Sequence, residues 1–408
     1  MIGLVALSLA WGAAAAWVVS ERASGASDVV ISSEPLSLDG QQIYRALSDA
    51  DATAASAFLS GGLEPAAARR RYLADIAAAA AHLESATATA GHSVVARDLA
   101  TLSAQLPVYA GEVETARTDN RLGLPLGAAY LREASGLMRG TLLPAARSIS
   151  AQASAQLSAA SGRATGLPLA AILLVIAVLV VYALFRAQRW LFRRTHRRLN
   201  LGLLLASGAV ALSLLWLVVA LGIARADLQR ARAHGSAPVA ALGAADIAAL
   251  RARADESLTL IDAGGDDSFQ TDFLAVQHQM GPGPGTLLTN AVTAANGTPA
   301  ADPAVQAEVT AAKWYAAHRN VRSLDDNGGH AQAIRLVTTP GPGHPGTLFG
   351  QLDDSLTRAI AADQAVFRSS AVAGRDAFTG LEVGVIVLAL VMAAGCAWGV
   401  SRRLAEYR

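Results

Sequence analysis

The sequence predicts an all-α membrane protein with four transmembrane helices and two tandem extracytoplasmic antiparallel helical bundles. Two observations support this prediction. The first is that an apolar span, a long helix-rich stretch and a second apolar span follow one another twice along the chain. The second is that an arginine-rich segment joins the two copies. Such a repeat indicates duplication of one structural unit.

Four apolar segments predict the transmembrane helices. Each is close to the length of about 20 residues that a helix needs to cross the hydrocarbon core, and none has an ionised side chain at its centre. They cover 1–19, 167–185, 201–223 and 381–400. The first lacks a basic flank and ends in small residues. A cleaved signal peptide and a start codon placed too far downstream are therefore the alternatives to a retained helix.

The distribution of charge predicts the orientation in the membrane. The segment 186–200, between the second and third spans, contains arginines and no acid, so the positive-inside rule places it in the cytoplasm. The basic tail 401–408 is expected on the same side. Segments 20–166 and 224–380 are then extracytoplasmic. We expect a multi-pass protein of the plasma membrane with both ends of the chain in the cytoplasm.

Apolar periodicity predicts helices in the first extracytoplasmic segment. Apolar residues recur at three- and four-residue spacing, which is typical of a helix with one buried stripe. Gly61 and Gly62 end the first helix, and Pro65 suits the first turn of the next. The predicted helices cover 40–60, 66–90, 93–118 and a stretch from Ala128 into the second span. Four antiparallel helices of this kind make an up-and-down bundle.

The second extracytoplasmic segment repeats this plan. Asp51 and Asp255 each lie at about the same distance beyond the preceding span, and each precedes a Gly-Gly pair. Glycine- and proline-rich breaks follow Met280 and Val337 and are longer than those of the first segment. A central helix is expected at about 303–326.

Composition excludes several classes of protein. The net charge of +1 gives no field that would attract nucleic acid. Cys396 is the only cysteine and lies in the fourth span, which excludes disulfides within the chain and cysteine-based zinc sites. Lys313 is the only lysine, and neither a phosphate-binding loop nor an HExxH motif is present. We therefore expect no enzyme, no catalytic residue, no metal and no cofactor.

Three stretches resemble a known family. Residues 49–65, 106–139 and 314–334 are similar to actinobacterial GlnX-type membrane proteins, and the third also resembles the four-helix-bundle sensor domains of bacterial chemoreceptors. The resemblance implies nutrient sensing: a lipoprotein that binds glutamine, glutamate or aspartate engages the membrane protein, which signals to the soluble serine/threonine kinase G. Chemoreceptor-like bundles also imply a homodimer. Chemoreceptors continue into a long cytoplasmic output, whereas the cytoplasmic part predicted here is one short loop and a tail, so the output must come from a partner.

Two sets of extracytoplasmic residues are candidates for binding a ligand or partner. The first surrounds one interhelical loop, where arginines can grip a carboxylate and tyrosines can close over it. It comprises Tyr109, Arg117, Asn120, Arg121, Tyr130, Arg132 and Glu133. The second, His318, Arg322 and Asp325, lies at helical spacing. The alternative for both sets is a structural role in local ion pairs.

Acidic residues near the ends of two equivalent helices are further candidates. They can meet either a partner or the opposing helix, and they comprise Asp49 and Asp51 with Thr53 in the first segment, and Asp255 and Glu256 in the second.

The arginine-rich loop is the candidate for docking a cytosolic partner. Its residues are Arg186, Arg189, Trp190, Arg193, Arg194, Arg197 and Arg198. The alternative is that these side chains only fix the topology and contact anionic lipid of the bilayer. The predicted function is a sensor that transmits a signal by piston, tilt or rotation of its helices. The alternative function is a structural or accessory envelope protein, such as a transporter-associated subunit.

Overall fold

The computed structural model describes residues 2–90, 95–165, 167–195, 201–262 and 267–405, which form helices joined by turns and include no strand. The predicted all-α class is therefore confirmed. The helices form two compact units. Unit 1 contains Met1–Ile31, Leu157–Arg230 and Ser369–Arg408, and unit 2 contains Ser32–Gln156 and Ala231–Arg368.

Three helical stretches among the described residues are long and apolar enough to cross a membrane. They cover Gly3–Leu59, Leu204–Asp262 and Pro345–Gly399, and they include the first, third and fourth predicted spans. The second predicted span falls within a helix of which several side chains lie outside the described residues, so the four-span topology stays a prediction. Large apolar side chains such as Leu179, Leu215 and Val383 are exposed on unit 1, as expected for a surface in contact with lipid.

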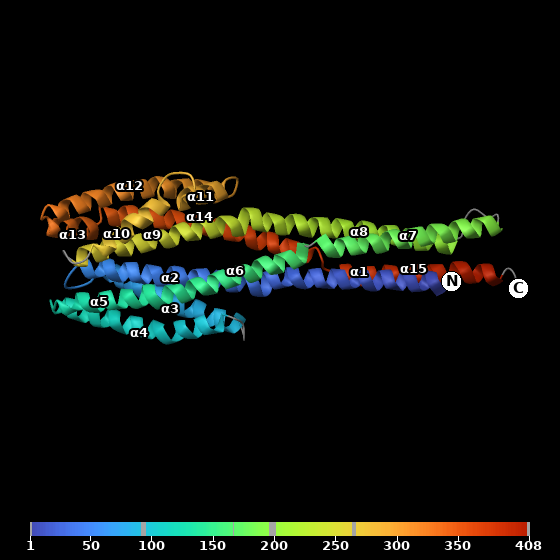
Figure 1. Ribbon diagram of the computed structural model, residues 1–408, viewed down its shortest axis with the longest axis horizontal. Helices are drawn as coiled ribbons and strands as arrows, with labels where there is room; N and C mark the ends of the chain where they lie inside the picture. The colour runs from blue at the N-terminus through green and yellow to red at the C-terminus, as the bar shows by residue number, and fades with distance from the viewer. Residues whose placement is uncertain (1, 91–94, 166, 196–200, 263–266, 406–408) are drawn as a thin grey trace. The chain divides into compact units, whose positions relative to one another are not determined.

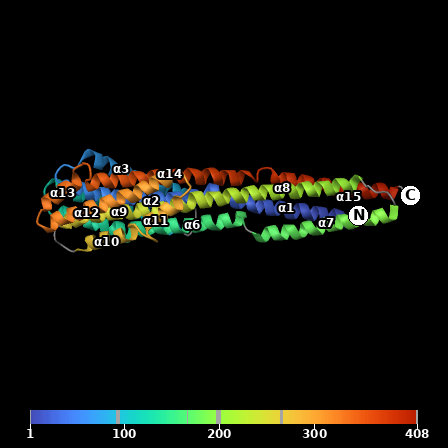
Figure 2. The same ribbon diagram turned by 90° about the horizontal axis from the view of Figure 1, so that it is seen from above.

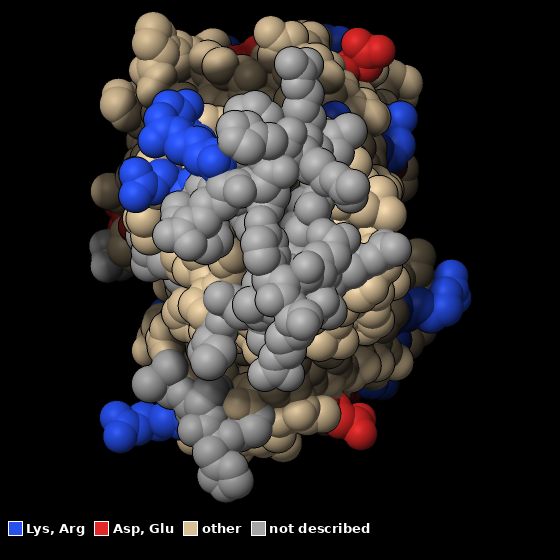
Figure 3. Space-filling view, turned by 90° about the vertical axis from the view of Figure 1, so that its right-hand side faces the viewer, with Lys and Arg blue, Asp and Glu red and all other residues tan. Residues whose placement is uncertain are grey.

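Unit 1 is built from long helices whose backbones come close together. They are α1 (Ile2–Asp28), α7 (Leu167–Thr195), α8 (Leu201–Ala231) and α15 (Leu381–Ala405). A Cβ added to Gly202 would lie 2.5 Å from the Cα of Gly399, and one added to Gly12 would overlap the Cβ of Ala389. Small residues at such crossings are typical of helices that pack within membranes. Figure 3 views the molecule from the side at which α7 ends, and both basic and acidic side chains are visible toward the edges of this view.

The first group of helices in unit 2 surrounds one apolar core (Figure 1). It consists of α2 (Glu34–Leu59), α3 (Ala66–Ala90), α4 (Ala96–Arg121), α5 (Leu126–Leu137), the π-helical turn η2 (Met138–Leu142) and α6 (Leu143–Thr165). Helix α3 has the bounds that the sequence predicts. Gly61 and Gly62 adopt positive φ values of 63° and 53°, the left-handed conformation that glycine adopts without steric penalty, and they end α2 as expected.

The second group of helices in unit 2 surrounds a separate core and has more breaks. It consists of α9 (Ala237–Asp262), α10 (Ser268–Met280), α11 (Leu287–Ala295), α12 (Ala301–Asp326), α13 (His330–Thr338) and α14 (Pro345–Asp376). The central helix α12 matches the prediction of 303–326. The sequence predicts four plain helices for this group, whereas the structure has the additional short helices α10, α11 and α13. The glycine-rich breaks after Met280 and Val337 interrupt the helices before and after α12.

Helices α2 and α9 pack side by side and join the two groups (Figures 1 and 2). Each continues a helix of unit 1 through a π-helical turn. Turn η1 (Val29–Ser33) connects α1 to α2, and turn η3 (Arg232–Ser236) connects α8 to α9. The chain is therefore helical without a break over Gly3–Leu59 and over Leu204–Asp262.

Candidate functional site

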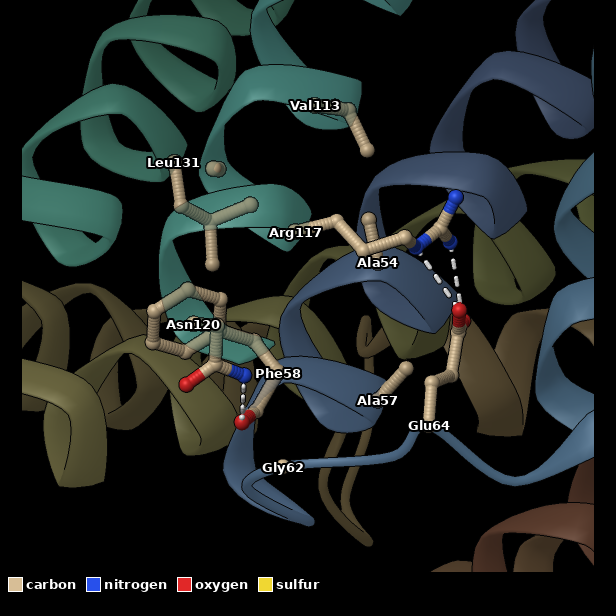
Figure 4. Close-up of a pocket in the computed structure, with 10 residues that line it drawn as sticks. Ala54, Ala57, Phe58, Gly62, Glu64, Val113, Arg117, Asn120 and Leu131 are labelled. Atoms are coloured by element: carbon tan, nitrogen blue, oxygen red, sulfur yellow. Dashed lines mark hydrogen bonds and ion pairs between the residues drawn. The ribbon is translucent and has the colours of Figure 1, made fainter. Parts of the chain in front are cut away.

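Arg117 and Asn120 of the first predicted binding cluster make contacts within their own helix group. Arg117 lies 2.7 Å from Glu64 and 2.8 Å from Glu114, and its guanidinium stands 5.2 Å from the centre of the Tyr72 ring. The Asn120 side chain donates to the Phe58 carbonyl oxygen at 2.9 Å (Figure 4). Arg117, Asn120 and Glu64 line a cavity of about 20 Å³ between α2 and α4, which has room for a water molecule. They tie α4 to the loop after α2.

The other members of this cluster are dispersed. The Tyr109 hydroxyl is buried and donates to Asp51 at 3.4 Å. Arg132 pairs with Asp262 of α9 at 2.5 Å. The remaining side chains lie away from the small cavity: Arg121 and Glu133 are exposed, and Tyr130 packs against the first core. The structure does not gather the seven residues into one binding pocket.

The second predicted set divides between the core and the surface. His318 is 1% exposed, stacks on Phe273 with ring centroids 3.6 Å apart, and makes a 3.0 Å hydrogen bond to Glu256. Glu256 also pairs with Arg253 and accepts from Trp314. Burial by itself raises the pKa of Glu256, but Arg253 and His318 bring it below its usual range.

At the surface, Arg322 pairs with Asp325 at 2.7 Å and with Asp326 at 2.6 Å, and Asp325 also contacts His330. These are the local ion pairs that helical spacing favours.

The described part of the predicted cytoplasmic docking set lies at the end of α7. Arg186, Arg189 and Arg193 are exposed. The side chains of Trp190 and Arg194, and the whole of Arg197 and Arg198, lie outside the described residues.

A set of charged residues at the interface of α2, α3, α9 and α14 is the main polar feature that the structure brings together. Arg45 of α2 donates from Nε to Asp246 of α9 at 2.6 Å and from Nη2 to Asp353 of α14 at 2.9 Å. The same Nη2 lies 2.6 Å from the hydroxyl of Thr357. Arg45 thus connects the first helix group to two helices of the second. We call these residues, with Arg71, Asp49 and Asp75 described next, the polar interface.

Arg71 of α3 forms the second half of the polar interface. Its guanidinium donates to both oxygens of Asp49 at 2.9–3.1 Å and to Asp353 at 2.7 Å. Asp353 therefore lies between two arginines. Asp75 is close enough to Asp49 for the two carboxylates to repel each other. Two guanidinium groups face four carboxyl groups, so the polar interface has an excess of negative charge when all of them are ionised.

Burial and mutual repulsion perturb the carboxyl groups of the polar interface. Burial raises the pKa of Asp246 to about 7, although Arg45 lowers it. Burial and then the charge of Asp49 raise the pKa of Asp75 to about 7. Asp246 Oδ1 and Asp75 Oδ2 are buried and make no hydrogen bond in the described part of the protein. Both groups can therefore gain or lose a proton near neutral pH, which is uncommon for aspartate.

Further ion pairs connect the helix groups. Arg139, in η2, lies 2.6 Å from Asp255 of α9, which is fully buried. Burial raises the pKa of Asp255 to about 6, although Arg139 lowers it. The pair Arg132–Asp262 lies farther along α9. Charged contacts thus join the two groups at several points along α9.

A groove opens beside the polar interface. It lies between α2, α6, α9 and α14 and has a volume of about 200 Å³. Arg45 and Asp246 line it together with Gln41, Gln42, Ser150, Ser154 and Gln364. It is open because α9 presents small residues, Ala240, Gly243 and Ala244, along this side.

Comparison with known proteins indicates what the first helix group is similar to. Residues 25–162 match a family model described as an actinobacterial sensor domain. The match supports a sensing role for a protein of actinobacterial type, and it favours that role over a catalytic one. No curated protein and no solved structure matches the chain.

Proposed function

We propose that the chain is a four-span membrane sensor that relays an extracytoplasmic amino-acid signal to a cytosolic serine/threonine kinase. A lipoprotein that binds glutamine, glutamate or aspartate delivers the signal. The sensor-domain match of 25–162 supports the sensing role, and the apolar helical stretches support a membrane location. The lipoprotein and the kinase rest on the family resemblance of the sequence.

The continuity of two helices is the observation that carries this proposal. The chain is helical from Gly3 to Leu59 and from Leu204 to Asp262, so α2 and α9 each continue into a predicted span. A shift, tilt or rotation of α2 against α9 would therefore displace residues of those spans. The π-helical turns η1 and η3 lie in the same two helices, and turns of this kind occur frequently at functional sites.

The polar interface gives α2 and α9 discrete contacts that a signal can change. Ion pairs such as Arg45–Asp246 either form or break when the helices move. The polar interface therefore favours a few discrete positions of α2 relative to α9 over a continuous range of positions. A partner can shift the balance only if it binds one arrangement better than the other. The lipoprotein would supply that difference in affinity at the surface of unit 2.

The arginines at the end of α7 are the proposed contact for the kinase. Arg186, Arg189 and Arg193 are exposed, and guanidinium groups bind the carboxylates of an acidic partner in bidentate fashion. The same side chains can contact anionic lipid of the bilayer when no partner is bound. A homodimer, as in chemoreceptors, would place two such arginine-rich segments close together.

Crosslinking in native membranes, followed by mass spectrometry, tests the relay. We expect the wild-type chain to crosslink to a lipoprotein outside and to a kinase inside. Changing Arg186, Arg189 and Arg193 to serine should remove the kinase and keep the lipoprotein. The matched control changes three exposed extracytoplasmic arginines, Arg70, Arg97 and Arg319, and should lose neither. Crosslinks only to lipid and to other copies of the chain would contradict the relay, and crosslinks to a permease would favour the accessory role.

A further inference from the structure

The groove beside the polar interface has the chemistry of a binding site for a small zwitterion. Asp246 is 1% exposed, it lines the groove, and its Oδ1 makes no hydrogen bond to the described residues. A buried carboxylate oxygen without a donor is costly to maintain. A ligand with a protonated amine would supply that donor and would offset the excess negative charge of the polar interface.

Arg45 supplies the complementary group. Its Nε and Nη2 atoms are used by Asp246, Asp353 and Thr357, whereas Nη1 makes no hydrogen bond within the described part of the chain. A quarter of the Arg45 side chain is exposed, and it lines the groove. Arg45 Nε and Asp246 Oδ2 are 2.6 Å apart, so the two oppositely charged side chains lie next to each other at the wall of the groove.

We propose that this groove binds an α-amino acid directly, with its ammonium group on Asp246 and its carboxylate on Arg45. An α-amino acid is a small ligand that carries an ammonium group and a carboxylate on the same carbon atom. The amides of Gln41, Gln42 and Gln364 and the hydroxyls of Ser150 and Ser154 line the rest of the groove, where they would hydrogen-bond a polar side chain. The volume of about 200 Å³ suits a ligand smaller than a drug-sized molecule.

The position of the groove gives binding a mechanical consequence. Its walls come from α2 and α6 of the first helix group and from α9 and α14 of the second. A ligand would draw Arg45 and Asp246 partly away from each other and change the contact between α2 and α9. This inference rests on the proposed function only in treating unit 2 as the sensing part, since binding itself needs neither a lipoprotein nor a kinase.

Calorimetry on the purified full chain in nanodiscs tests the proposal. The standard α-amino acids are titrated one at a time, each beside its α-hydroxy acid, which lacks the ammonium group, and its N-trimethyl betaine, which lacks N–H donors. We expect at least one amino acid to bind and both of its analogues to bind about tenfold more weakly or worse, the loss typical of a charged hydrogen bond. Binding of no amino acid, or equal binding of an analogue, would overturn the proposal.

Three variants separate the site from general effects on folding. Asp246→Asn keeps the shape of the side chain and should weaken binding about tenfold or more. Gln364→Ala removes a groove amide outside the ion pairs and should weaken it severalfold. Gln351→Ala, an exposed position on the same helix α14 but outside the groove, should bind as the wild type does. Unchanged affinity in both groove variants would overturn the assignment. Loss of kinase crosslinking with amino-acid binding intact would instead count against the relay.

Discussion

Arg45→Met should destabilise unit 2 by about 3 kcal/mol near pH 8. The substitution removes the donors to Asp246, Asp353 and Thr357 while it keeps an unbranched apolar chain in place. Deleting one partner of a buried ion pair costs about 3–5 kcal/mol. The lower value applies here because a quarter of the Arg45 side chain is exposed.

The cost of Arg45→Met should increase with pH. Arg45 lowers the pKa of Asp246, which burial raises to about 7, so its removal raises that pKa further. Above about pH 7 the folded variant then keeps a proton that its unfolded state, with an aspartate pKa of about 3.9, has released. The stabilisation from this proton is complete below about pH 4 and is lost as the pH rises through the folded pKa. The cost should therefore grow by up to about 1.4 kcal/mol per pH unit above about pH 7.

Thermal unfolding followed by circular dichroism, at about pH 6 and about pH 8, measures this effect. A loss of about 3 kcal/mol corresponds to a decrease in Tm of roughly 6–12 °C for a domain of this size. The matched control is Arg69→Met, which breaks the half-exposed pair Arg69–Glu114 within the first helix group and should cost less than about 1 kcal/mol. An Arg45→Met cost that is no greater than the control, or that does not change with pH, would refute the reasoning.

Two other substitutions, each with a matched control, test packing in unit 2 and are measured as changes in Tm. Gly235→Ala places a Cβ 2.6 Å from the Cβ of Phe367 and should lower the stability by about 1–3 kcal/mol. The control Gly136→Ala, in helix α5 with open space around it, should raise the stability by up to about 1 kcal/mol. Equal Tm values for the two variants would contradict the close approach at η3. His318→Ala removes a stacked ring and a donor to buried Glu256 and should cost about 2–4 kcal/mol. His330→Ala, at a partly exposed ion pair, should cost under about 1 kcal/mol, and the reverse order would show that His318 is not a core residue.

Helix boundaries could be predicted where a local signal fixes them. Helix α3 begins just after Pro65 and α2 ends before two glycines with positive φ, and both features are legible in the sequence. The short helices α10, α11 and α13 were not predicted, since the number of breaks in a glycine-rich stretch depends on how its apolar residues reach the core.

The polar interface could not be predicted from the sequence. Arg45, Asp246 and Asp353 are separated by more than a hundred residues from one to the next, and their meeting depends on the packing of α2 against α9 and α14. A partial signal was present: Asp49 and Asp255 were predicted to meet either a partner or an opposing helix, and they lie against Arg71 and Arg139. Arg117 drew attention because it lies near a loop, yet its guanidinium is taken up by local acids.

A distance measured at the end of unit 1 tests most directly whether changes in the polar interface are transmitted through α2 and α9. Spin labels at Ala6→Cys and Leu204→Cys, two exposed positions in a Cys396→Ser background in nanodiscs, report by electron–electron double resonance the separation of α1 and α8, the helices that continue into α2 and α9. Breaking the polar interface with Arg45→Met should change the distribution of this distance, whereas Arg69→Met should leave it as in the parent. Identical distributions in all three proteins would contradict the account.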